Sequence, residues 1–214
     1  MPLSFARLKS FIFFAAALLL FSGNCTRVSR IVGSAGPYHT ETYKGVFDAW
    51  SRQARIHRGL EVRLIVSATF KSEEYRRAYA DEYAKAYKLT PEGKKQFVED
   101  QLKAAGHSHD FLMASFVPEK KCDDFHKAKS MWKLYLVNDQ HERVVPVEVR
   151  KLKRQDAVTP HFFPYITPWK SIYTVRFPYK MPATNQPIIK DNTKEIKLVI
   201  TGVLGTAEMG WELR

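Results

Sequence analysis

The 214-residue chain contains only two cysteines, Cys25 and Cys122, and this scarcity limits its covalent cross-links. A Cys25–Cys122 disulfide is the single internal bridge available. That bridge requires an oxidising compartment and a Cys25 thiol that carries no other group.

The common catalytic signatures are also missing. The sequence has no Gly-x-Ser-x-Gly, no phosphate-binding P-loop, no dinucleotide glycine fingerprint and no His-Glu-x-x-His. Its Ser, His and Asp residues are scattered, and no triad can be assembled from them without a fold. The sequence therefore leans towards a non-catalytic protein without a cofactor, although an enzyme is not excluded.

Long hydrophobic runs are absent as well, apart from the eleven residues Phe11–Phe21. A membrane-spanning helix needs about 20 apolar residues, so this run is too short to cross a bilayer. Arg7 and Lys9 precede it, and the small or polar residues Ser22, Gly23 and Asn24 follow it. This order predicts an export signal peptide over residues 1–24.

The segment Phe11–Cys25 resembles the precursor of a bacterial lipoprotein, which is cut before a cysteine that then carries lipid on its thiol. Ser22 and Asn24 depart from the usual motif, which has an aliphatic residue and a small residue at these places. The resemblance implies lipidation of Cys25 and a membrane anchor. Thr26, which is not acidic, favours the outer membrane, facing the periplasm. Cleavage near Ser22, giving a soluble secreted or periplasmic protein, and an uncleaved anchor are the alternatives.

Acidic residues are the minority charge: 22 Asp and Glu stand against 34 Lys and Arg, which gives a formal net charge of +12. An exported protein meets phospholipid headgroups, lipopolysaccharide phosphates and anionic wall polymers, so nucleic acid is not expected as a partner. The densest basic run comprises Arg150, Lys151, Lys153 and Arg154. It either grips phosphates on a membrane surface or forms a solvated edge.

Residues 25–40 are polar, contain Gly33, Gly36 and Pro37, and are interpreted as a tether to a single domain over residues 41–214. Within that domain, Leu60–Phe70 alternates apolar and polar residues and predicts a half-buried antiparallel strand. Ser72 and Thr90 are typical helix caps, and they predict helices near 72–88 and 91–105. Glu41–Trp50 is ambiguous, because Gly45 weakens an otherwise helical spacing.

Several further short strands follow the two helices. We expect one continuous strand over Val144–Leu152, with Val145, Val147 and Val149 on one face and Pro146 marking an edge or a bulge. The other predicted strands are Phe111–Val117, Met131–Val137, Ser171–Phe177, Glu195–Val203 and an alternating stretch from Ala207 to Leu213. This pattern predicts a mainly β (α+β) domain, an antiparallel two-sheet, Ig-like β-sandwich with an inserted helical pair.

One cluster has the residue types of a metal site: His107, His109, Cys122 and His126, with Asp110, Asp123 and Asp124 among them. Its spacing matches no zinc signature, and the strand between its two halves places them at opposite ends. The alternative interpretation is a polar loop with exposed histidines.

The segment Thr159–Trp169 offers four rings, Phe162, Phe163, Tyr165 and Trp169, on a backbone stiffened by prolines. Such rings either stack a sugar or peptide ligand or close one end of the sandwich. A further set of rings recurs every four residues in the first helix. These are Tyr75, Tyr79, Tyr83 and Tyr87. Either this helix lies on the sheet with its ring bodies buried and its hydroxyls at the rim, or the rings form a face that stacks a sugar or peptide.

Three functional hypotheses follow from these observations. The first is a lipid-anchored envelope protein whose sandwich is a binding or scaffolding module. The second is a metal-dependent envelope enzyme that uses the region of His107, His109, Cys122 and His126. The third is an accessory protein in the assembly of an outer-membrane or wall complex.

Overall fold

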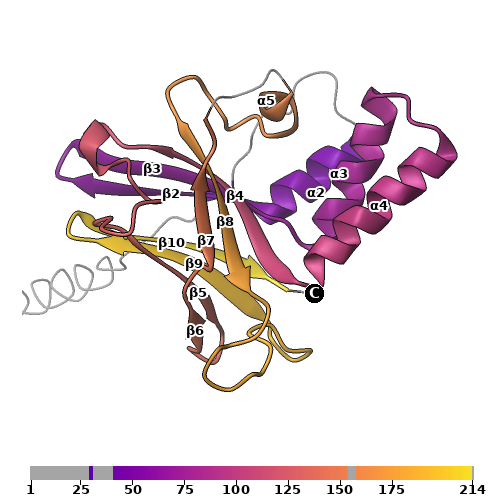
Figure 1. Cartoon of the computed structure of the whole chain (residues 1–214). Coiled ribbons are helices and arrows are strands. Elements are labelled where there is room, and N and C mark those ends of the chain that lie inside the picture. The colour runs from indigo at the N-terminus through magenta and orange to yellow at the C-terminus, as the bar shows by residue number, and fades with distance from the viewer. Residues whose placement is uncertain (1–28, 31–40, 154–157, 214) are drawn as a thin grey trace, which may run out of the picture.

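The computed structural model describes residues 29–30, 41–153 and 158–213 (Figure 1). The predicted signal peptide, Cys25 and Arg154 lie outside these residues. Within them, no helix has the length and apolar character needed to span a membrane.

The larger of two antiparallel sheets has six strands in the order β1-β2-β3-β4-β8-β7. β3 and β4 form its centre, and β7 lies at one edge. The strands are β1 (Ser29–Arg30), β2 (Ser51–Arg58), β3 (Glu61–Phe70), β4 (Ser108–Phe116), β7 (Glu148–Lys151) and β8 (Ser171–Pro178).

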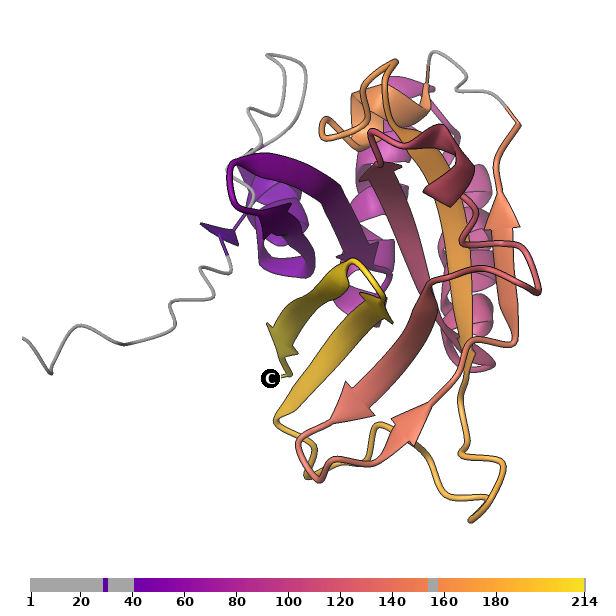
Figure 2. The same cartoon turned by 90° about the vertical axis from the view of Figure 1, so that its left-hand side faces the viewer.

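The smaller sheet has four strands in the order β10-β9-β5-β6, also antiparallel. β10 lies beside β2 (Figure 2), where the Trp211 indole Nε1 donates a 2.9 Å hydrogen bond to the Trp50 carbonyl. Its strands are β5 (Lys133–Asn138), β6 (Arg143–Val144), β9 (Glu195–Gly202) and β10 (Gly205–Glu212). Two antiparallel sheets with an inserted helical pair confirm the predicted fold class.

The core lies on the inward faces that the alternation predicts. On β3, Leu64, Val66 and Ala68 are fully buried. On the smaller sheet, the fully buried residues are Ile196, Leu198, Ile200, Met209 and Trp211. Side chains that alternate along a strand point to opposite faces, so one face of each sheet is removed from water.

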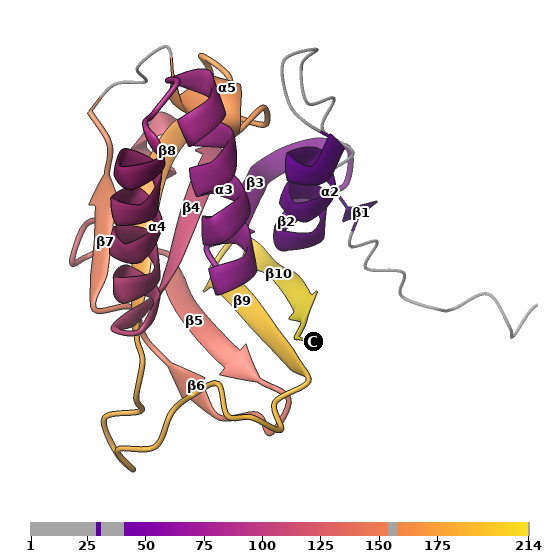
Figure 3. The ribbon, with the colours of Figure 1, turned by 90° about the vertical axis from the view of Figure 1, so that its right-hand side faces the viewer.

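The helices gather on one side of the sheets (Figure 3). α2 (Glu41–Trp50) resolves the ambiguous stretch as a helix, and α3 (Glu73–Ala86) and α4 (Pro91–Ala105) match the predicted pair. The Ser72 hydroxyl accepts a hydrogen bond from the Tyr75 backbone N–H at 3.1 Å, and Thr90 does the same for Gly93. Both caps satisfy backbone donors that a helix start leaves open.

The expectation of a continuous strand over Val144–Leu152 is wrong. The chain forms β6 and then β7, which belong to different sheets. Val145 and Val147 lie between them and are 59% and 64% exposed, so they do not share an inward face with Val149. The break falls at Pro146, which has no backbone N–H to donate to a neighbouring strand.

Candidate ligand-binding cleft

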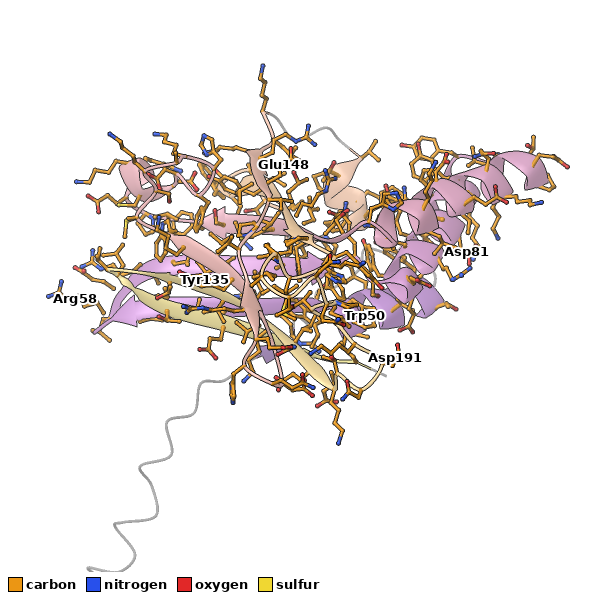
Figure 4. The ribbon with its side chains drawn as sticks, turned by 60° about the horizontal axis from the view of Figure 1, so that its bottom comes forward. Trp50, Arg58, Asp81, Tyr135, Glu148 and Asp191 are labelled. Atoms are coloured by element: carbon orange, nitrogen blue, oxygen red, sulfur yellow. The ribbon has the colours of Figure 1, made fainter. Side chains whose placement is uncertain are left out.

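A cleft of about 750 Å³ opens where β3 passes into α3 and where β4 begins. The loop at residues 189–194 and the end of the chain after β10 complete its wall. Trp50 and Asp191, which both line it, lie on the same side of the molecule in Figure 4. The cleft therefore combines segments from six separate parts of the sequence.

His109 lines this cleft from the second residue of β4 and is only 7% exposed. Its ring lies between two others. The centroid distance is 5.4 Å to the stacked Tyr179 ring and 6.1 Å to the tilted Phe70 ring. Burial lowers the pKa of His109 to about 4, with the charge of Asp110 opposing the shift. The imidazole is thus neutral at pH 7.

The Nε2 atom of His109 is buried and has no hydrogen-bond partner. Among the described residues, Asp48 Oδ1 and Arg63 Nε share this state, but both of those side chains are more exposed than His109. Buried polar atoms in proteins are nearly always paired, so this unpaired ring nitrogen marks His109, a residue that lines the cleft, as a candidate for ligand contact.

Charges of both signs surround the cleft. Lys71, Lys190 and Asp191 all line it. Burial, followed by the charge of Arg76, lowers the pKa of Lys71 to about 8. The Trp50 indole N–H donates to the Glu74 carboxylate at 2.9 Å, which holds an acidic side chain at the start of α3. The arrangement suits a ligand that has charges of both signs and an uncharged hydrogen-bonding group.

The predicted metal residues do not come together. His107 and His109 lie at the start of β4, whereas Cys122 and His126 follow its end. Asp123 holds the second pair there by accepting a hydrogen bond from Ser115 Oγ at 3.2 Å. His109 and Ser115 are six residues apart on one strand, roughly 20 Å. Across the described part of the chain, no group of three or more His, Cys, Asp or Glu side chains is placed to hold a metal ion.

Cys122 is buried, and burial, with the hydrogen bond to Glu119, raises the pKa of its thiol. It forms no disulfide with a described residue. The alternative Cys25–Cys122 bridge stays a prediction, since Cys25 lies outside the described residues.

Three of the four rings in the aromatic segment are inside the core. Phe162, Phe163 and Tyr165 are 1%, 6% and 5% exposed. The short helix α5 (Thr159–Phe162) brings Phe162 edge-on to Tyr79 of α3 at 5.0 Å. These rings and the tyrosines of α3 therefore pack against each other, as the end-closing interpretation predicts. Trp169, which is 75% exposed, is the exception.

Lys151 of the basic run forms an ion pair, because its Nζ lies 2.9 Å from Asp123 Oδ2. Arg150 is exposed and lies 3.8 Å from Glu148, and Lys153 is exposed. The run is therefore divided between a partly buried ion pair and the surface.

Sequence reasoning selected His109 as a metal ligand but missed its neighbours Lys71 and Tyr179. No motif links these residues, and only the sheet register brings them together, since His109 pairs with Phe177 on β8. Comparisons of the chain with protein-family models, with curated proteins and with solved structures gave no match.

Proposed function

We propose that this protein is a bacterial cell-envelope lipoprotein, anchored by a lipid on Cys25 to the outer membrane and facing the periplasm. Its sandwich domain is a non-catalytic binding module, and the ligand occupies the His109 cleft. The observation that carries the binding part of this proposal is the unpartnered Nε2 of His109, a residue that lines the cleft of about 750 Å³.

The chemistry of the cleft indicates the kind of ligand. A neutral imidazole forms a hydrogen bond without requiring a counter-charge. Tyr179, which is 37% exposed, offers a ring for stacking, and the rim carries both Lys and Asp or Glu side chains. Glycopeptide fragments of the cell wall have hydroxyl and amide groups together with charges of both signs, so they are the class that we expect to bind.

The anchor is tested by the intact mass of the mature protein from the membrane fraction, beside a Cys25→Ser variant. We expect a species that begins at Cys25 with added acyl mass, absent from the variant. An unacylated, soluble species would contradict the anchor and favour a secreted or periplasmic protein.

The cleft is tested by calorimetric titration with wall fragments released by a muramidase. Tyr179→Ala should weaken binding about ten-fold or more, because it removes the ring that stacks on His109. Tyr87→Ala is the matched control, since Tyr87, which directly follows α3, is 46% exposed and does not line the cleft. Equal effects of the two variants, or no binding by the unaltered protein, would overturn this assignment.

A further inference from the structure

A second pocket, of about 370 Å³, lies where β7 ends and β8 begins. Figure 3 shows these two strand ends at the same end of the molecule as α5. Three lysines, Lys151, Lys153 and Lys170, line the pocket together with Ser171, and its described lining contains no acidic residue. We name it the lysine pocket.

Among the described residues, the lysine pocket has three lysines in its wall and one carboxylate, that of Asp123, beneath them. Asp123 lies behind Ser171 and is 2.9 Å from the Lys151 ammonium, so it offsets one charge. Lys170 Nζ donates to the Tyr165 carbonyl at 2.9 Å and to Ser67 Oγ at 3.2 Å. Burial, and then the charge of Arg55, lowers the pKa of Lys170. A lowered pKa means that the charged form of Lys170 is disfavoured in this site, so a bound anion would stabilise that charge.

An exposed tryptophan adjoins the lysine pocket. Trp169 lies between Pro168 and Lys170, which both line it, and is 75% exposed. The other three tryptophans, Trp50, Trp132 and Trp211, are at most 8% exposed. An indole beside basic groups is favoured at the boundary between lipid headgroups and acyl chains, where its apolar body and its N–H both find suitable surroundings.

We propose that the lysine pocket binds the phosphate of an anionic lipid headgroup, with Trp169 entering the membrane interface beside it. Lysine ammonium groups attract phosphate as point charges. This contact would seat the domain on a membrane surface by the α5 end. It is non-covalent and does not depend on a lipid on Cys25.

Trp169 provides the readout. Because the other three tryptophans are buried, acrylamide quenching of the full chain reports mainly on Trp169. We expect vesicles that contain phosphatidylglycerol to protect this tryptophan, and vesicles of phosphatidylcholine alone to leave it accessible. All variants share the apolar run Phe11–Phe21, so any insertion through that segment is common to them.

The charge requirement is tested with Lys153→Gln/Lys170→Gln, which should weaken binding to the anionic vesicles about 30-fold. Lys153→Gln alone changes an exposed side chain, keeps the fold, and should weaken binding about five-fold. The matched control is Lys103→Gln/Lys180→Gln. These exposed lysines lie at the opposite end of β8, more than a Debye length of about 10 Å away, and their loss should have little effect.

The remaining outcomes distinguish a lipid phosphate from a free phosphate, and binding by the lysine pocket from binding by a lipid on Cys25. Protection of Trp169 that persists in Cys25→Ser would support the lysine pocket whether or not the lipoprotein proposal stands. Unchanged quenching on anionic vesicles, or equal weakening by the control pair, would overturn the proposal. Binding of inorganic phosphate without binding of vesicles would also overturn it, because the pocket would then take a free phosphate.

Discussion

A titratable group lies among buried side chains at each end of β4, and the two groups differ in their hydrogen bonding. At the end of the strand, Asp123 receives hydrogen bonds from Ser115, Ser171, Tyr173 and Lys151. At the start, His109 keeps Nε2 without a partner. A group whose hydrogen bonds are all made (the saturated group, Asp123) stabilises the fold, whereas the unpaired group (the open group, His109) is the one to which we assign ligand contact in the proposed function.

Hydrogen bonding explains why Asp123 is a charged group although it is only 8% exposed. Burial raises the pKa of its carboxyl group, but the hydrogen bonds from Lys151, Ser171 and Tyr173 together lower it further and leave the pKa below its usual value. For His109, burial is the larger effect, and the imidazole loses its proton instead.

The largest expected effect comes from removing the saturated group. Asp123→Ala leaves several donors without an acceptor and the Lys151 ammonium without its counter-charge, at a cost of about 3–5 kcal/mol in the free energy of unfolding. Urea denaturation measures this change. The control is Asp81→Ala, which breaks an exposed ion pair with Lys94 and should cost less than about 1 kcal/mol. If Asp123→Ala lowered the free energy of unfolding no more than Asp81→Ala, the hydrogen-bonded carboxylate at the end of β4 would not be a main source of stability.

The second prediction concerns pH and the open group. The unfolded chain protonates His109 near pH 6.5, whereas the folded protein does so near pH 4. Between these values the unfolded state binds more protons, so stability falls as the pH is lowered from about 6.5 to 4. The loss is about 3 kcal/mol and is complete below pH 4.

Denaturant titrations from pH 7.5 to pH 4 test this prediction. His109→Phe keeps a ring between Phe70 and Tyr179 but cannot be protonated, so most of the loss above pH 4 should disappear. His107→Gln removes an exposed imidazole two residues away and serves as the control. If His109→Phe retained the full pH dependence, the loss would have to come from other groups.

The smallest effect should follow from deleting one donor of the saturated group. Tyr173→Phe removes a 2.9 Å hydrogen bond to Asp123 and leaves the other donors in place, so we expect a cost of about 1 kcal/mol. Tyr135→Phe on β5 is the control, because its hydroxyl makes no hydrogen bond with a described residue. Thermal unfolding resolves this difference. A cost near that of Asp123→Ala would show that the donors do not act independently.

Much of the secondary structure was predictable because its causes are local. Ser72 and Thr90 each cap a helix through a backbone N–H three residues ahead, and the alternation in β3 extends over neighbouring residues. The chain divides into β6 and β7 at Pro146, the residue that in the sequence suggested an edge or a bulge. Which sheet each half joins was not predictable, because strand pairing is decided by distant segments.

The candidate site was less predictable for the same reason. His109 drew attention as a ligand type, but its actual neighbours are Tyr179, seventy residues along the chain, and Phe70. Phe163 and Trp169 looked alike as rings in one segment, yet one is 6% and the other 75% exposed. Residue type and spacing do not specify which ring other elements cover.

The sequence by itself determined the α3–α4 pair, the alternating strands and the fold class, since caps, periodicity and turn residues act over a few neighbouring positions. Only the tertiary structure decided that Asp123 is saturated, that His109 is open and that three lysines share a pocket beside an exposed Trp169. Burial and hydrogen-bond partners are set by contacts between segments far apart in the chain, and these contacts form only when the two sheets and the helices pack together.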